Sequence, residues 1–295
     1  MKWVNNYLKS KNLKALKYEI RGKAVIVKTD NGTLVLKAKD RSSNDNIFSY
    51  LNSRNFNYYP KIIDDDNFYV TEYQKDTKMP LEQKMNDLVD LVSLLHSKTT
   101  YYKEIDIDDY KKIYEDINNN ILHLRTYYND LMTIIEAKTF MSPSEYLLAR
   151  NISKIFGALN FCDGELKNWE KIMKDKKKQR FVVLHNNLDI NHFIRNKRSY
   201  LISWDKARID IPIFDLYKLY KKYGLDYEFE SILKNYERSY PLLEEEKILL
   251  YVLISLPDKI EFNDSEYVMC QKISHLIDLL YKTEQVISPY YAKKS

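Results

Sequence analysis

With 295 residues, of which 44% are hydrophobic and 30% charged, the chain is long enough to bury one large core or two medium ones. It has no apolar run long enough for a membrane span and no secretory-signal pattern, and its two cysteines cannot build a disulfide framework, so a cytoplasmic location is expected. The formal net charge of +5 is small and the one compact basic run lies at 174–180, so no nucleic-acid partner is expected.

The first 75 residues are predicted to form a small, strand-rich lobe. Its strongest signal is a β-hairpin, in which a β-branched run at 23–29 and a second strand at 33–38 flank an Asp-Asn-Gly turn. Lys37 lies near the end of the second strand. The elements expected after the hairpin are a helix at 44–54 and short extended runs at 61–63 and 68–71.

Beyond about residue 76 the apolar period changes to that of a helix, which predicts a larger helical lobe over 76–295. An apolar stripe predicts a helix over 81–96, and a second helical region spans roughly 108–137. Ser142 opens a third helix with a capping box and a proline at the first helical position. The last 80 residues are predicted to be helical as well.

One strand-like segment interrupts the helical lobe. Residues 181–204 contain three short apolar runs, FVVLH, HFIRN and SYLISW, which are joined by polar links. Burying such links is costly, because their backbone polar groups need partners. We therefore expect this segment to form part of a ligand site in a cleft between the two lobes.

Three motifs in and after this segment carry a family resemblance. They are HNNLDINH at 185–192, LISWDKA at 201–207 and PIFDL at 212–216. In order and spacing they resemble motifs of the aminoglycoside phosphotransferase and choline kinase family, closest in pattern to its bacterial, spore-coat-associated kinase-like branch. The resemblance implies an α+β, bilobal, protein-kinase-like fold. A small antiparallel-sheet N-lobe would cover 1–75, and a larger helical C-lobe would cover 76–295 and hold the catalytic-loop-like segment 181–216.

The resemblance also implies roles for single residues. Lys37 matches the lysine that pairs with phosphates, and Glu72 and Tyr73 fall where the family has its hinge to the adenine. ATP is therefore the implied cofactor, bound in the interlobe cleft. His185 and Asp215 match residues that hold the loop in place, so structural roles are expected for both.

The departures from the family pattern fall on the residues that carry the chemistry. Asn187 stands at the position of the catalytic base, His192 at that of a metal-binding asparagine, and Ser203 at that of a metal-binding aspartate. An asparagine cannot accept the proton of a substrate hydroxyl. A serine hydroxyl and an imidazole are poor replacements for the hard, anionic oxygens that magnesium prefers, so weak magnesium binding is expected.

The alternative to the loss of these catalytic groups is a site in which they are supplied by residues two positions further along the sequence. Asp189 and Asp205 each lie two residues after a replaced position, and side chains at i and i+2 of an extended segment share a face. Asp189 would then act as the base and Asp205 would hold the metal. The acid that pairs with the phosphate-binding lysine in the family has Asp40 or Asp45 as its candidate here.

Three functions remain open on the sequence. The first is a pseudokinase that works as a ligand-binding or scaffolding module for a nucleotide, another small molecule or a protein partner. The second is an active, ATP-dependent small-molecule phosphotransferase with atypical metal ligands, whose helical region 108–137 shapes the pocket for a hydroxyl acceptor. The third is a structural component of an assembly such as a spore coat.

Overall fold

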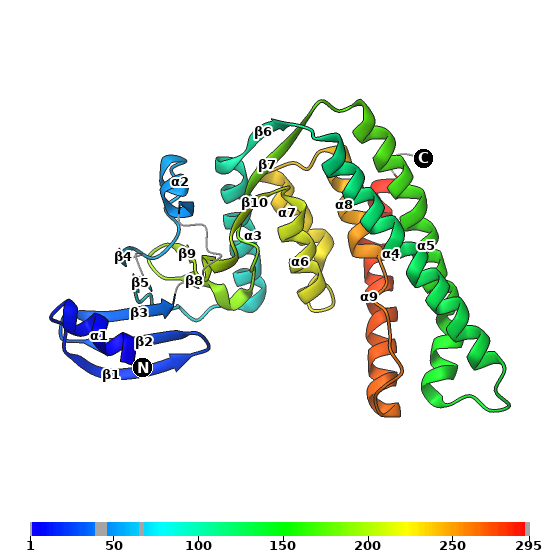
Figure 1. Cartoon of the computed structure of the whole chain (residues 1–295), viewed down its shortest axis with the longest axis horizontal. Coiled ribbons are helices and arrows are strands. Elements are labelled where there is room, and N and C mark those ends of the chain that lie inside the picture. The colour runs from blue at the N-terminus through cyan, green and yellow to red at the C-terminus, as the bar shows by residue number, and fades with distance from the viewer. Residues whose placement is uncertain (1, 39–45, 65–67, 293–295) are drawn as a thin grey trace. The chain divides into compact units, whose positions relative to one another are not determined.

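The computed structural model describes residues 2–38, 46–64 and 68–292 and divides the chain into two compact units. Unit 1 comprises Met1–Thr99 and Val183–Ile209, and unit 2 comprises Thr100–Val182 and Asp210–Ser295. The fold class is α+β, as predicted, with an antiparallel sheet in unit 1 and mainly helices in unit 2 (Figure 1). The lobe boundary at residues 75 and 76 stays a prediction.

An antiparallel sheet forms the first part of unit 1, with the strand order β1-β2-β3-β5-β4. Its strands are β1 (Ala15–Arg21), β2 (Ala24–Thr29), β3 (Gly32–Ala38), β4 (Ile62–Asp64) and β5 (Phe68–Glu72). Strands β2 and β3 confirm the predicted hairpin. Strand β1 and the helix α1 (Lys2–Ser10) were not predicted from the sequence.

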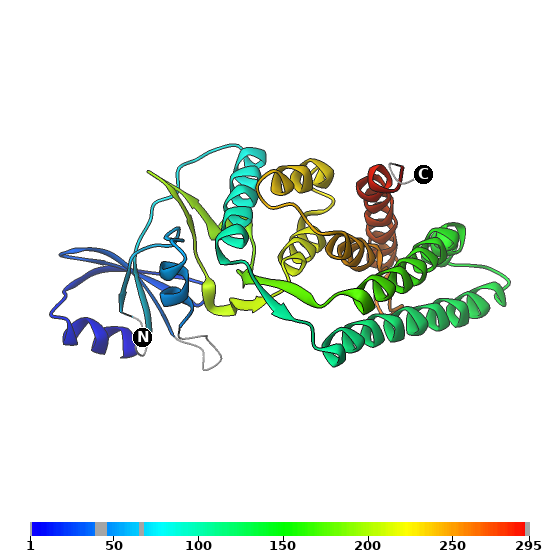
Figure 2. The ribbon, with the colours of Figure 1, turned by 90° about the horizontal axis from the view of Figure 1, so that it is seen from above.

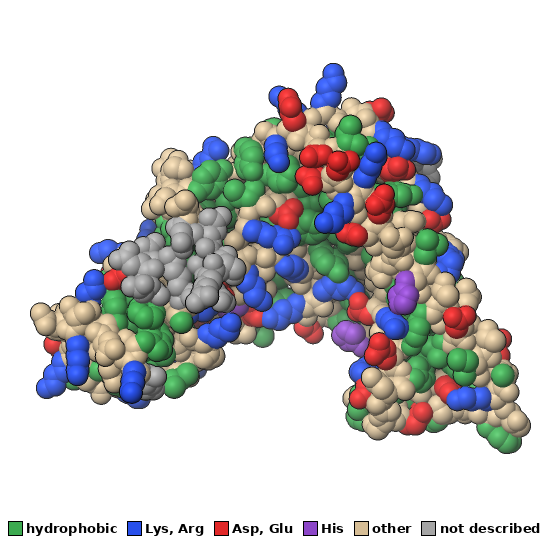
Figure 3. Space-filling view, in the orientation of Figure 1, with side chains coloured by type: hydrophobic (Ala, Val, Ile, Leu, Met, Phe, Trp, Pro, Cys, Tyr) green, Lys and Arg blue, Asp and Glu red, His purple; other side chains and the backbone are tan. Residues whose placement is uncertain are grey.

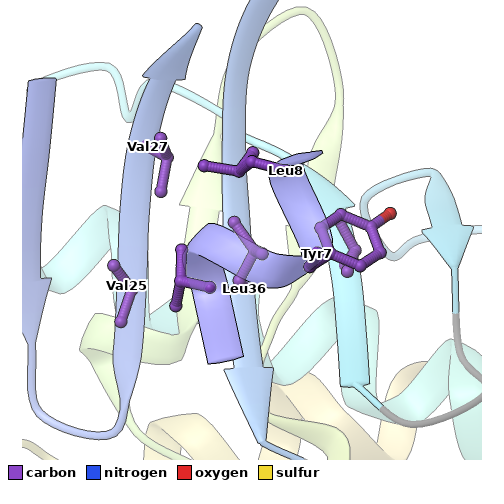
Figure 4. Packing of buried hydrophobic residues seen from close by; sticks show 7 residues of the cluster. Tyr7, Leu8, Val25, Val27 and Leu36 are labelled. Atoms are coloured by element: carbon purple, nitrogen blue, oxygen red, sulfur yellow. The ribbon is translucent and has the colours of Figure 1, made fainter. Parts of the chain in front are cut away.

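Helix α1 covers one face of this sheet. Its buried residues Val4, Tyr7 and Leu8 follow the spacing of an amphipathic helix. In Figure 4 the side chains of α1 lie against Val27 and Leu36 of the sheet. Both of these sheet residues are fully buried, so this layer holds β2 and β3 in place from one side.

Unit 1 is completed by helices and by a later segment of the chain. Its further elements are α2 (Ile47–Ser53), α3 (Leu81–Thr99), the short 3-10 helices η1 (Ile190–His192) and η2 (Trp204–Lys206), and strands β8 (Phe193–Arg195) and β9 (Ser199–Leu201). Helix α3 confirms the helix predicted over 81–96. Residues 44 and 45 of the helix predicted at 44–54, and both Asp40 and Asp45, lie outside the described residues. The backbone N–H of Leu201 donates to the carbonyl of Tyr58 at 2.7 Å, which joins the later segment to the earlier one.

Long helices dominate unit 2. Its elements are β6 (Tyr101–Glu104), α4 (Ile107–Glu136), α5 (Pro143–Asp175), α6 (Ile213–Tyr223), α7 (Phe229–Ser239), α8 (Glu244–Ser255) and α9 (Glu266–Ala292). Strand β7 (Lys178–Leu184) pairs with β6, and both β7 and β10 (Arg208–Asp210) contain a point where the chain passes between the units. Helices α4 and α5 lie side by side in both ribbon views (Figures 1 and 2). The capping box at Ser142 is present, as predicted.

The surface of the long helices is polar and mixed in charge. On the face shown in Figure 3, Lys and Arg side chains alternate with Asp and Glu over these helices. Charged residues of these helices also form i,i+4 ion pairs, such as Lys167 with Asp163 on α5. Among the described residues, no helix is long and apolar enough to span a bilayer.

Candidate functional site

A cavity of about 600 Å³ lies within unit 1 and is lined by the sheet face opposite α1. The strand register decides which side chains face it. Ile26 pairs with Val35, and Lys37 pairs with both Ala24 and Tyr69, so these five residues share one face of the sheet. All five line the cavity. Their neighbours in sequence on β2 and β3, such as Val25 and Leu36, face α1 instead.

The turn between β1 and β2 forms one edge of the cavity. It consists of Gly22 and Lys23 and follows Arg21, and all three residues line the cavity. Gly22 has a φ of +56°, a conformation that glycine adopts without strain. Arg21 is held by Glu19, whose carboxylate accepts from Nε at 2.6 Å. The turn therefore brings two cationic side chains to the cavity.

The end of β5 and the residues that follow it form another part of the lining and contain the predicted hinge. Glu72 and Tyr73 both line the cavity. Their backbone N–H groups donate to the carbonyls of Lys61 and Thr33 at 3.1 and 3.0 Å. Because both backbone N–H groups already donate to these carbonyls, a nucleotide base at this position would have to bond to other groups of the segment.

The catalytic-loop-like segment is fixed by hydrogen bonds to the strand that follows it. His185 is fully buried, its Nε2–H donates to the carbonyl of Ile202 at 2.9 Å, and its ring lies edge-on to Trp204. The side-chain amide of Asn187 donates to the carbonyl of Ser203 at 3.4 Å. These contacts place Asn187 and Ser203, which the resemblance aligns with the catalytic base and a metal ligand, side by side in the lining.

His192 also lines the cavity, but its ring is committed to the loop. Its Nδ1–H donates to the carbonyl of Asn187 at 2.8 Å. Ser203 adopts a left-handed backbone conformation with a φ of +67°, which is uncommon for a residue with a side chain. Both residues thus have fixed positions in the site.

Asp189 and Asp215 do not line the cavity. Asp189 is 9% exposed and caps η1, where its carboxylate accepts from the backbone N–H of Asn191 at 2.7 Å. Asp215 is fully buried in the first turn of α6, in unit 2. The geometry of Asp189 is that of a capping residue. Its role as a base and the structural role of Asp215 both stay predictions.

Within the part of the lining that the structure describes, each carboxylate forms an ion pair with a lysine. The pairs are Glu72 with Lys61 (3.9 Å), Asp76 with Lys84 (2.6 Å) and Asp205 with Lys37. The carboxylate of Asp76 also accepts from the backbone N–H of Arg195 at 2.9 Å. Burial raises the pKa of Asp205, but the hydrogen bond and the charge of Lys37 outweigh this, so the net pKa lies below its usual value. Asp205 is therefore ionised at neutral pH.

These residues fit a magnesium ion poorly. The three predicted metal positions offer one carboxylate, on Asp205, and Lys37 already neutralises its charge. His192 offers an imidazole and Ser203 a neutral hydroxyl, whereas magnesium prefers hard oxygen ligands in octahedral geometry. No group of three or more His, Cys, Asp or Glu side chains suited to a metal occurs among the residues that the structure describes.

Four charged residues of the described lining were not predicted from the sequence, namely Arg21, Lys23, Asp76 and Lys84. Lys84 lies on α3 in the same helical stripe as Leu88 and Leu91, and it is 9% exposed. A lysine within an apolar stripe is a signal that was present in the sequence, because burying its ammonium group requires a nearby carboxylate. Asp76, eight residues earlier, supplies it.

Comparisons with known proteins agree on the fold. An aminoglycoside phosphotransferase from Alicyclobacillus acidocaldarius aligns with a TM-score of 0.69 and 9% identity, over 95% of this chain and 92% of its own. Spectinomycin phosphotransferase, in complex with ADP and spectinomycin, aligns with a TM-score of 0.55 and 12% identity, over 96% and 98%. A choline kinase from Streptococcus pneumoniae aligns with a TM-score of 0.50 and 16% identity, over 99% and 96%.

No protein-family model and no curated protein matches the sequence. The resemblance inferred from the three motifs is nevertheless confirmed at the level of the fold, because the solved structures align over nearly the full chain. The chain has the protein-kinase-like fold of the aminoglycoside phosphotransferases and choline kinases.

Proposed function

We propose that the chain is a pseudokinase, a kinase-fold protein that binds a nucleotide in the cavity of unit 1 and does not carry out ordinary metal-dependent phosphoryl transfer. The observation that carries this proposal is that each carboxylate among the described lining residues is paired with a lysine. A general base has to accept a proton, and the residue at the base position, Asn187, cannot do so.

The expected loss of rate is large. General-base catalysis contributes about 10²–10⁴-fold, and phosphoryl transfer depends further on metal ions that neutralise the developing charge. With Asn187 at the base position and a single, lysine-bound carboxylate at the metal positions, both contributions are weakened together. The chemistry of the side chains therefore favours binding over catalysis.

Three observations support a nucleotide as the ligand. The cavity volume of about 600 Å³ falls within the range of small-molecule sites. Lys37, Glu72 and Tyr73, the predicted nucleotide contacts, all line it. A solved protein of the same fold, spectinomycin phosphotransferase, is known in complex with ADP.

The finer predictions remain proposals. An active phosphotransferase that uses Asp205 as an atypical metal ligand is the main alternative, and it would use the region 108–137 to bind a hydroxyl acceptor. A scaffolding role with a protein partner, membership of the spore-coat-associated branch and a cytoplasmic location also stay predictions.

Thermal unfolding with ATP, ADP or AMP, each with magnesium or with EDTA, tests the proposal. A ligand at a hundred times its dissociation constant stabilises by about 2.7 kcal/mol, which shifts the Tm by several degrees. We expect a shift in EDTA that Lys37→Met removes. Lys167→Met, which breaks an exposed pair on α5, is the matched control and should leave the shift unchanged.

A parallel assay follows transfer of the γ-phosphoryl group of ATP to water and to choline or aminoglycoside acceptors. We expect turnover near the uncatalysed background. A nucleotide shift that appears only with magnesium, together with turnover that Asp205→Asn abolishes, would establish the active phosphotransferase instead. The absence of a shift with every nucleotide would remove the nucleotide from the proposal.

A further inference from the structure

The ion pair between Lys37 and Asp205 joins two parts of unit 1 that are distant in sequence. Lys37 lies on the cavity face of β3, and Asp205 lies in η2, 168 residues later. Their side chains are 21% and 18% exposed, and both line the cavity. The pair is thus largely shielded from solvent, where the attraction between opposite charges is stronger than at the surface.

The carboxylate of Asp205 occupies the ammonium group of Lys37, which is the cation that a phosphate group would need. Lys37 is the lysine that the fold resemblance assigns to phosphate pairing. When its ammonium group binds Asp205, an incoming phosphate meets a carboxylate at contact distance from the same cation. Two anions at that distance repel each other, so the phosphate has to displace the carboxylate.

The other lining pairs are less suited to this exchange. Asp76 binds Lys84 and also accepts from the backbone N–H of Arg195, so its carboxylate is tied to β8 as well. Glu72 is separated from Lys61 by 3.9 Å, and both side chains are about half exposed or more. In the Lys37–Asp205 pair both side chains are shielded, and both residues line the same cavity as Glu72 and Tyr73.

We propose that the Lys37–Asp205 ion pair is an autoinhibitory contact that limits the binding of phosphate-bearing ligands and opens when a phosphate takes the place of the carboxylate. This inference rests on the proposed function, because it regulates the same cavity. It gives Asp205 a role opposite to that of a metal ligand. A metal ligand favours the binding of phosphates, whereas this carboxylate competes with them.

Affinity measurements in EDTA with three probes test the inference. Adenosine has no phosphate, ADP carries both parts of the ligand, and inorganic pyrophosphate carries the anion alone. We expect Asp205→Asn to raise the affinity for ADP and pyrophosphate at least about tenfold, because it removes one unit of negative charge beside the phosphate site. The affinity for adenosine should change less than about twofold.

Two further variants serve as controls. The double variant Lys37→Met/Asp205→Asn should not show the increased affinity for ADP and pyrophosphate, since the cation that the phosphate binds is then missing. Asp163→Asn, which neutralises a lysine-bound aspartate on the surface of α5, should leave all three affinities unchanged. Far-UV circular dichroism and the Tm of each variant show that it is folded.

The outcomes separate the inference from the proposed function. Lower or unchanged affinity of Asp205→Asn for ADP and pyrophosphate would overturn the inference while leaving nucleotide binding intact. If adenosine and ADP bind neither the original protein nor Asp205→Asn, the nucleotide would be ruled out as the ligand of the proposed function. A gain for pyrophosphate would even then support the competition at Lys37, and failure of pyrophosphate as well would overturn both.

Discussion

Breaking the buried ion pair between Arg180 and Glu246 by removing one partner is expected to destabilise unit 2 strongly. The two side chains are 8% and 4% exposed, and the Nε–H of Arg180 donates to Glu246 at 2.6 Å. The guanidinium group also donates to the carbonyl of Pro241 at 2.6 Å and lies 4.2 Å from the ring centroid of Tyr240. Glu246 in turn accepts from the backbone N–H of Leu243 at the start of α8.

Replacing Arg180 with methionine keeps the apolar part of the side chain and leaves the carboxylate of Glu246 buried without its cation. We expect a loss of about 3–5 kcal/mol in the free energy of unfolding, because a buried charge without its partner is strongly unfavourable. In Arg180→Met/Glu246→Leu both charges are removed, and the double variant should recover to within about 2 kcal/mol of the original protein.

Urea unfolding followed by far-UV circular dichroism measures these differences, since the helices of unit 2 dominate the signal. Lys167→Met is the control, because its exposed pair with Asp163 is worth less than about 1 kcal/mol. A loss below about 1 kcal/mol for Arg180→Met would contradict the reasoning. So would a double variant that is less stable than the single one, since the cost would then come from lost packing.

Two other predictions concern helix α5. Ser142→Ala removes the side chain that accepts from the backbone N–H of Glu145, and it should lower the free energy of unfolding by about 1 kcal/mol, measured by urea unfolding. An effect near zero would show that the capping box does not stabilise the helix. Burial raises the pKa of the Cys162 thiol to about 12. At pH 8 a disulfide reagent should therefore modify the half-buried Cys270 at least a hundredfold faster than Cys162, and equal rates would refute the burial argument.

The elements that the sequence predicts well are those with a local physical signal. The hairpin of β2 and β3 follows from a β-branched pattern and a turn, and strand alternation alone places Lys37 on the face opposite Leu36. Helix α1 was missed because its apolar stripe of Val4, Tyr7 and Leu8 is short and lies among lysines and asparagines.

The arrangement of the site depends on contacts that no local pattern contains. The motifs place Asp205 two residues after Ser203, but they do not show that its carboxylate binds Lys37, 168 positions away. Likewise, Asp189 follows the base position closely in sequence, yet its carboxylate caps η1. Neighbouring positions on a loop need not share an orientation, because each side chain follows the hydrogen bonds of its own backbone turn.

The discontinuity of unit 1 has a consequence for how the protein forms during synthesis. The residues that line its cavity come from Met1–Thr99 and Val183–Ile209, so the ribosome has to add 110 residues after Thr99 before the second segment is complete at Ile209. At about 5–20 residues per second this takes roughly 6–20 s. During that interval the sheet face that bears Ile26, Val35 and Lys37 lacks its later covering segment, which makes the nascent chain a natural client for chaperones that bind exposed apolar surface.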